Sequence, residues 1–217
     1  RSGHEVVWQD GPTEGLSWER QLSNLLITRP DLVCWEVKTP SALRTYEAIR
    51  QLKASCPETI VVLVGDHVTA LPDEAHESCP VDIVVCGGDY DFSLREIAAW
   101  VERGYGNLPE YVELSPEDTD RFIWRKPTDT KLNTLPTIDR ELCRWMDYSR
   151  MGNYLYRPGT HGYSARDCWW RSGGGCTFCS WTNTYKNYRQ LSVDQFMADV
   201  ESAHALGARE YFDDAGT

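Results

Sequence analysis

The sequence predicts an α/β protein whose main body is a doubly wound parallel sheet. Short β-rich runs alternate with segments of helical periodicity from the first residues to about residue 103, which is typical of a parallel sheet covered by helices. The run at residues 60–64 is apolar at every position, as expected of a strand covered on both faces. A second, shorter pattern of strands and a helix begins near residue 158. The chain therefore holds one α/β domain and the opening of another.

The first domain is expected to span residues 1–103. Each of its helices begins at a serine or aspartate that can cap it. The predicted strands are 5–8, 31–37, 59–64 and 81–85, and the predicted helices are 17–28, 41–54 and 91–103. Gly3 stands directly before the first strand and is typical of a helix end, so we expect a βα unit upstream of Arg1.

Residues 104–157 are predicted to form an interdomain linker, because prolines and acidic residues interrupt any regular pattern. Apolar side chains along it, such as Phe122, Trp124 and Trp145, predict that it is partly ordered. The second domain, 158–217, should contain strands at 160–165 and 210–212 and a helix at 192–206. One βα unit and one strand cannot close a core, so we expect this domain to continue beyond Thr217.

Charge and hydropathy exclude two classes of partner. The formal net charge of −11 repels phosphate backbones, which argues against nucleic acid. The sequence has no apolar run of the ~18 residues that a membrane span needs, and the N-terminal residues lack a secretory layout. We therefore expect a cytoplasmic chain with no membrane partner, in which the 8 cysteines are reduced and available as ligands.

The strongest chemical signal is a loop with three cysteines, Cys168, Cys176 and Cys179. Three glycines at 173–175 let the backbone take positive φ values and approach a cofactor closely. Three thiolates on one short loop can reach a common centre, and a cubane cluster held by three ligands keeps one iron open. This favours an iron–sulfur cluster that binds a further small molecule.

Two other interpretations of these cysteines are open. A closed structural zinc site needs a fourth ligand, and His161, on the predicted strand, is the nearby candidate. Cys176 and Cys179 have the spacing of a redox pair, although that motif normally opens a helix in a thioredoxin-like unit. Of the scattered cysteines, Cys34 and Cys86 lie in apolar runs and are expected to be small buried side chains.

The loop resembles the cluster loop of radical S-adenosylmethionine enzymes, with Phe178 at the aromatic position before the last cysteine. The resemblance implies a [4Fe-4S] cluster on Cys168, Cys176 and Cys179. It also implies S-adenosylmethionine bound at the open iron and cleaved reductively to a 5′-deoxyadenosyl radical. The implied partners are an electron donor such as flavodoxin or ferredoxin and a small-molecule or peptide substrate. In this family the cofactors carry the difficult chemistry.

The whole layout resembles the cobalamin-dependent branch, which includes the anaerobic magnesium-protoporphyrin cyclases. That branch joins a B12-binding domain, Rossmann- or flavodoxin-like, to a partial (β/α) barrel. The resemblance implies that cobalamin lies against two loops at the carboxyl ends of strands, where ligands bind in open sheets. The residues implied there are Gly65, His67, Thr69, Gly87 and Gly88. Asp213 and Asp214, at the end of the last predicted strand, resemble the residues that meet S-adenosylmethionine.

Two features depart from the family pattern. Seven residues separate Cys168 from Cys176, where the usual number is three. Asp66 adjoins His67, so His67 is expected to be a loop residue near the corrin rather than a cobalt ligand. The implied function is hydrogen abstraction or methyl transfer on an unactivated carbon, by an enzyme of which this fragment is expected to be inactive alone. The alternatives are a radical enzyme whose N-terminal module has lost cobalamin and a non-enzymatic zinc-binding protein.

Overall fold

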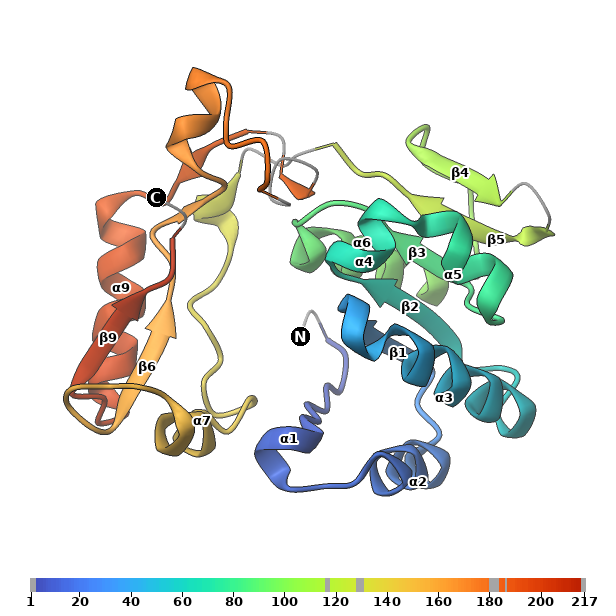
Figure 1. Ribbon diagram of the computed structural model, residues 1–217, viewed down its shortest axis with the longest axis horizontal. Helices are drawn as coiled ribbons and strands as arrows, with labels where there is room; N and C mark the ends of the chain where they lie inside the picture. Colours follow the sequence, from blue (N-terminus) through green and yellow to red (C-terminus); the bar gives the residue numbers. More distant parts are fainter. Residues whose placement is uncertain (1–2, 116–117, 128–130, 180–183, 186, 216–217) are drawn as a thin grey trace. The chain divides into compact units, whose positions relative to one another are not determined.

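The computed structural model describes residues 3–115, 118–127, 131–179, 184–185 and 187–215. The chain divides into two compact units, and Figure 1 labels most of their helices and strands. The sheet unit consists of Leu22–Asp129 and Ser180–Lys186. The cysteine unit consists of Arg1–Gln21, Thr130–Cys179 and Asn187–Thr217.

The sheet unit is built on five strands in the order β1-β2-β3-β5-β4. The first four pair in parallel and β4 runs antiparallel at the edge. The strands are β1 (Leu32–Glu36), β2 (Ile60–Val64), β3 (Ile83–Val85), β4 (Val112–Ser115) and β5 (Asp118–Trp124). The mostly parallel α/β sheet predicted from the sequence is confirmed, because β2 and β3 are apolar along their length and covered by helices.

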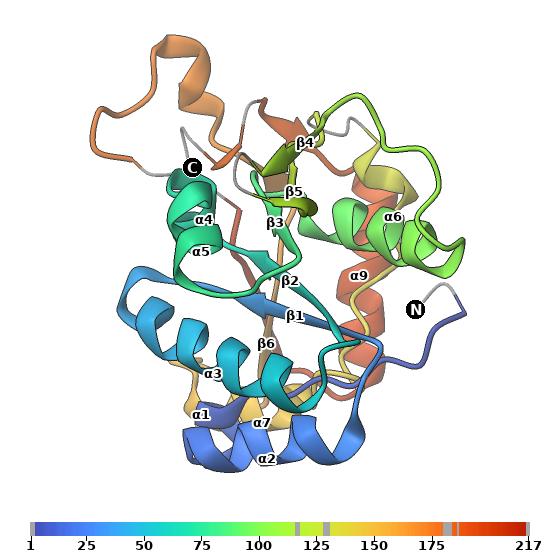
Figure 2. The same cartoon turned by 90° about the vertical axis from the view of Figure 1, so that its right-hand side faces the viewer.

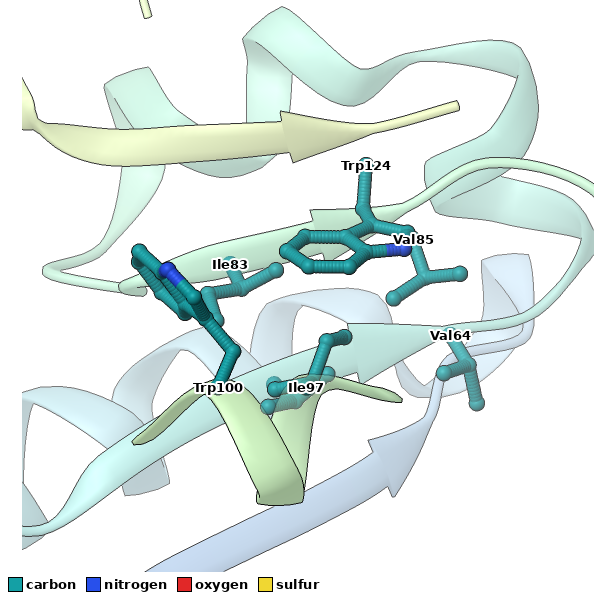
Figure 3. Close-up of a cluster of buried hydrophobic side chains, with 7 residues drawn as sticks. Val64, Ile83, Val85, Ile97, Trp100 and Trp124 are labelled. Carbon is teal, nitrogen blue, oxygen red and sulfur yellow. The ribbon is translucent and has the colours of Figure 1, made fainter. Parts of the chain in front are cut away.

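Helices cover both faces of this sheet, as the turned view in Figure 2 shows. On one face lie α3 (Ala42–Ser55), α4 (Asp66–Ala70) and α5 (Pro72–Ser78), and on the other lies α6 (Tyr90–Glu102). Ile97 and Trp100 of α6 pack on Ile83, Val85 and Trp124, whose side chains point to the same face (Figure 3). Within the described residues, no helix combines the length and apolarity required to cross a bilayer.

Most of the predicted elements are present, and one is wrong. The helix predicted at 17–28 is α2 (Trp18–Thr28). The strand predicted at residues 5–8 has no regular structure, and a four-residue helix, α1 (Gly11–Glu14), follows it. Val7 is 75% exposed, whereas the Trp8 indole Nε1 donates a hydrogen bond of 2.8 Å to the Tyr148 hydroxyl. A side-chain anchor, rather than a strand partner, holds this run of β-prone residues.

The segment predicted as a linker contributes two strands to the sheet. β5 pairs with β3, with Phe122 opposite Ile83 and Trp124 opposite Val85. Trp124 is fully buried, which explains why this segment adds to the sheet. The boundary expected near residue 103 therefore falls before the last two strands of the sheet unit. Further along, η2 (Leu132–Thr134) and α7 (Trp145–Met151) belong to the cysteine unit.

The cysteine unit has two short parallel strands and one long helix. β6 (Gly159–Gly162) pairs with β9 (Glu210–Asp213), and α9 (Val193–Ala205) lies between them in the chain. Ser192 caps α9, its hydroxyl accepting a bond of 3.2 Å from the Gln195 amide. The strand predicted at 160–165 is divided into β6 and β7 (Ala165–Arg166), and β7 pairs antiparallel with β8 (Arg189–Gln190).

A buried ion pair joins the segment before β6 to α9. Arg140 donates to both carboxylate oxygens of Asp199, at 3.0 and 2.7 Å, and both side chains are buried. Burial by itself raises the pKa of the Asp199 carboxyl, but bonds from Arg140, the Ile138 amide and the Tyr211 hydroxyl together hold that pKa below its ordinary value. The carboxylate therefore stabilises the fold above an ordinary pKa of about 3.9, and this contribution is lost as the pH falls through the lower folded value.

We expect Asp199→Ala to lower the free energy of unfolding by about 3–5 kcal/mol, because it leaves the Arg140 guanidinium buried without its carboxylate. Urea denaturation followed by circular dichroism measures the change. Asp194→Ala, at the exposed start of the same helix, is the control and should cost less than about 1 kcal/mol. Equal urea midpoints for the two variants would contradict the structural role of the pair.

Candidate functional site

The three clustered cysteines lie on the loop that connects β7 to β8. Cys168 follows β7 and stands at the start of a short helix, η3 (Trp169–Gly173). Cys176 and Cys179 follow η3, and the Cys179 amide donates to the Cys176 carbonyl at 3.1 Å, so that one turn carries both. Cys176 is exposed, whereas Cys168 and Cys179 are half-buried. None of the three forms a disulfide.

The loop is coiled, which shortens the long spacing between Cys168 and Cys176. The Arg171 amide donates to the Cys168 carbonyl at 3.1 Å, and the Gly174 amide donates to the Arg171 carbonyl at 3.0 Å. Gly174 and Gly175 then take φ values of 106° and 69°, a region that glycine enters without steric cost. The two glycines reverse the chain after η3. Of the three glycines at 173–175 for which the sequence predicts positive φ values, Gly174 and Gly175 have them and Gly173 does not.

Arg171, in the helix η3 that follows Cys168, binds the carboxylate of Asp167, the residue directly before Cys168. Arg171 forms an ion pair with Asp167 through two nitrogens, of which Nη2 lies 2.8 Å from Oδ1. The hydrogen bond and the charge of Asp167 raise the pKa of the Arg171 guanidinium. This pair spans the first turn of the loop, from the residue before Cys168 to the middle of η3.

Three histidine, cysteine or acidic side chains grouped tightly enough for a single metal ion are not found among the described residues. A cubane cluster binds its thiolates on separate irons, so the donors it needs stand further apart than those around a zinc ion. His161, the expected fourth ligand of a zinc site, packs its ring against Tyr154 and Phe212, with centroids 5.3 Å away in each case. Three thiols and a glycine-reversed backbone fit the donor set of a cluster.

Phe178 and Asp214, both expected to contact S-adenosylmethionine, are exposed. Phe178 lies on the turn between Cys176 and Cys179, and its side chain is 90% exposed. Asp214 follows β9, and its amide donates to the Gly162 carbonyl of β6 at 2.8 Å. The Asp214 carboxylate therefore stands at the carboxyl end of the parallel pair, where ligands bind in such folds.

Asp213 has a local role that the sequence did not predict. Its carboxylate accepts bonds from the Ser164 amide at 2.8 Å and the Ser164 hydroxyl at 2.5 Å, and a third from the Ala215 amide at 3.2 Å. These bonds tie the turn after β6 to the end of β9. Asp213 thus fixes the backbone on which Asp214 stands.

The loops expected to line a corrin crevice meet at one edge of the sheet. Gly65 ends β2 with φ at 117°, and a Cβ atom there would lie 2.5 Å from the Val37 carbonyl oxygen. The Thr69 hydroxyl accepts a bond of 3.1 Å from the Gly87 amide, which joins the loop after β2 to the loop after β3. The structure therefore brings Gly65, Thr69 and Gly87 together at the carboxyl edge.

Thr184 and Tyr185 also lie at this edge, which no sequence pattern predicted. The Tyr185 ring lies over Gly88 so closely that a Cβ atom on Gly88 would stand 2.2 Å from its Cε1 atom. The hydroxyl of Thr184, a buried residue, donates to Asp66 Oδ1 at 3.2 Å. Thr184 and Tyr185 belong to the sheet unit although they follow the cysteine loop in sequence. A glycine at position 88 is thus explained by Tyr185.

His67 is held among the helices. Its imidazole is buried, with Nδ1 3.1 Å from the Thr39 hydroxyl and Nε2 3.2 Å from Glu74 Oε1. Thr39 belongs to η1 (Thr39–Ser41) and Glu74 to α5. Both ring nitrogens are therefore engaged by side chains. Trp181, close to the cysteine loop in sequence, lies outside the described residues.

No family model and no curated protein matches this chain. A solved structure does: the radical S-adenosylmethionine methyltransferase TsrM from Kitasatospora setae, with cobalamin and a [4Fe-4S] cluster bound. The TM-score is 0.58 at 17% sequence identity, and the match covers 98% of this chain and 42% of that one. At this identity the likeness shows a shared fold. The chain spans less than half the length of that methyltransferase.

We expect Gly65→Ala to lower the free energy of unfolding by about 1–3 kcal/mol. The added Cβ atom would collide with the Val37 backbone, and the positive φ of residue 65 is unfavourable for alanine. The urea midpoint of the full chain measures the change. Gly106→Ala is the matched control, since no atom lies within 4 Å of the Cβ position at residue 106. If the two alanine variants unfold at the same urea concentration, the contact between residue 65 and the Val37 backbone does not require a glycine at position 65.

Proposed function

We propose that this chain is the cofactor-binding part of a radical S-adenosylmethionine enzyme that uses a [4Fe-4S] cluster and cobalamin. The reaction is hydrogen abstraction or methyl transfer on an unactivated carbon. The observation that carries the proposal is the coiled loop with three cysteines, in which η3 and the left-handed Gly174 and Gly175 shorten the path between Cys168 and Cys176. The order of an α/β sheet followed by this loop, and the fold shared with the TsrM methyltransferase, support it.

Cys168, Cys176 and Cys179 would hold the cluster through their thiolates. A cluster with one iron free of protein ligands supplies the electron for cleavage of S-adenosylmethionine bound at that iron. The exposed thiol of Cys176 and the exposed ring of Phe178 leave one side of the loop open to a ligand. Asp214 would attract the amino group of S-adenosylmethionine. Asp213 would hold the backbone of Asp214 in place through its bonds to Ser164.

The proposed partners and setting follow from this chemistry. The cluster requires an electron donor such as flavodoxin or ferredoxin, and the substrate is a small molecule or a peptide. A reducing cytoplasm suits the chain because none of its eight cysteines forms a disulfide. Within the cobalamin-dependent enzymes, we place the chain nearest the magnesium-protoporphyrin cyclase-like branch on the resemblance of its sequence.

Cobalamin would lie at the carboxyl edge of the sheet, against Gly65, Thr69 and Gly87. A specific observation also favours a second candidate, an N-terminal module that works without cobalamin. Tyr185 lies over Gly88 at this edge, and both nitrogens of His67 are engaged. A corrin at this edge would therefore displace Tyr185 and would receive no bond from His67.

Anaerobic reconstitution with iron and sulfide tests the cluster. We expect the wild-type chain to gain about four irons and visible charge-transfer absorbance, and Cys176→Ala to lose most of both. Cys143→Ala is the control, because Cys143 is a half-buried thiol outside the loop, and it should keep the cluster. Tight zinc binding without iron uptake by the wild-type chain would instead support a zinc-binding protein.

Equilibrium dialysis of the full chain against cobalamin separates the two candidate functions. If cobalamin binds at the edge that Tyr185 covers, Tyr185→Ala should bind it with a lower Kd than the wild-type chain, because a larger fraction of the protein is competent to bind. Tyr156→Ala, an exposed tyrosine of the cysteine unit, should leave the Kd unchanged. Retention by neither the wild-type chain nor Tyr185→Ala would favour the cobalamin-free module.

A further inference from the structure

The residue directly before the first cysteine is a buried aspartate in an uncommon conformation. Asp167 has φ at 69°, and its side chain is 1% exposed. Residues other than glycine occupy the left-handed region in only a few per cent of cases, although aspartate enters it more readily than most. A buried carboxylate in this conformation persists only where its surroundings determine it.

Arg171 supplies the surroundings that Asp167 requires. Its guanidinium binds the carboxylate through Nε and Nη2, with one nitrogen to each oxygen, and its side chain is only 23% exposed. Two parallel bonds of this kind fix the relative orientation of the two groups as well as their separation. The pair spans four residues and encloses Cys168 together with the first turn of η3. The direction of the chain at Cys168 therefore depends on Arg171.

This pair folds the part of the loop that exceeds the usual family spacing. Five of the seven residues between Cys168 and Cys176 belong to η3. An extended chain advances about 3.3–3.6 Å per residue, whereas a 3₁₀-helix rises about 2.0 Å per residue. Coiling therefore shortens the span of the chain between Cys168 and Cys176. Gly174 and Gly175 then reverse the direction of the chain.

We propose that Asp167 and Arg171 are positioning residues for the cluster, whose ion pair coils the long spacing so that Cys168 serves as the third thiolate. The inference rests on the proposed function, because it presumes a cluster on this loop. It assigns a role to two residues that are not among the expected ligands of the cluster or of S-adenosylmethionine. The pair also places a carboxylate and a guanidinium, neutral together, beside the cysteine ligands.

Because the pair is neutral as a whole, removing either of its charges should shift the reduction potential of the cluster, and the two shifts should have opposite signs. Charge close to an iron–sulfur cluster shifts its reduction potential, since added positive charge favours the reduced and more negative cluster. Asp167→Asn leaves the positive charge of Arg171 uncompensated, so the potential should rise. Arg171→Gln leaves the negative charge of Asp167 uncompensated, so the potential should fall. A role limited to folding the loop would give no such opposition of sign.

The experiment measures iron and sulfide per chain and the reduction potential after anaerobic reconstitution, in the wild-type chain and these two variants. Arg171→Lys keeps the charge but loses the two-nitrogen contact, so its cluster content should lie between those of the wild type and Arg171→Gln. Arg150→Gln, an exposed arginine of the same unit, is the control and should match the wild type. We expect reduced cluster content in both Asp167→Asn and Arg171→Gln and potentials displaced in opposite directions.

A shortened loop keeps the inference testable if these variants hold too little cluster for a potential to be measured. Deleting residues 170–173 together with Asp167→Asn leaves three residues between Cys168 and Cys176, so the pair is no longer required. This chain should regain the cluster that Asp167→Asn alone loses. Its failure to do so would overturn the inference, as would full cluster content and unchanged potentials in the two single variants. Absence of a cluster in the wild-type chain would instead refute the proposed function.

Discussion

One constraint governs the proposed cluster site: three thiols on a single loop would have to reach one centre, although seven residues separate the first two. The loop shortens this spacing with a short helix closed by two left-handed glycines, and an ion pair spans its first turn. The base of the loop is fixed by neighbouring strands, because Asp213 at the end of β9 binds Ser164 after β6. Arg140 and Asp199 hold the helix behind these strands.

The sheet unit follows the general rule for open parallel sheets, in which ligands bind outside the carboxyl ends of the strands. Gly65 lets the chain pass close to Val37 there, and the bond between Gly87 and Thr69 joins adjacent loops. The same edge holds Thr184 and Tyr185, residues that follow the cysteine loop in the chain. Two sites that the sequence suggested separately are thus linked by a short stretch of one polypeptide.

The sequence was sufficient to predict a strand or a helix wherever the pattern that specifies it lies within a few neighbouring residues. Residues 60–64 are apolar throughout and form a central strand, and Ser192 stands where the cap of α9 is required. It was insufficient where partners are distant. β5 begins with four polar residues before Phe122, which hid its strand pattern within the supposed linker. Cys34 lies in an apolar run, yet it is exposed because β1 forms the edge of the sheet.

In the candidate site, too, features that depend on neighbouring residues could be predicted, whereas contacts between distant residues could not. The clustering of the three cysteines and the positive φ values of Gly174 and Gly175 could be predicted from the sequence, because these residues lie close together along the chain. The partners of His67 were not, since Thr39 lies 28 residues away and reaches the ring only through the fold. The packing of Tyr185 on Gly88 spans almost a hundred positions of the chain for the same reason.

The most direct test of the central claim is a crystal structure of the anaerobically reconstituted chain, with anomalous scattering measured at the iron edge. The account predicts one compact iron peak bonded to the sulfurs of Cys168, Cys176 and Cys179, with one iron free of protein ligands. Iron bound by other cysteines, or by Cys176 and Cys179 without Cys168, would contradict it.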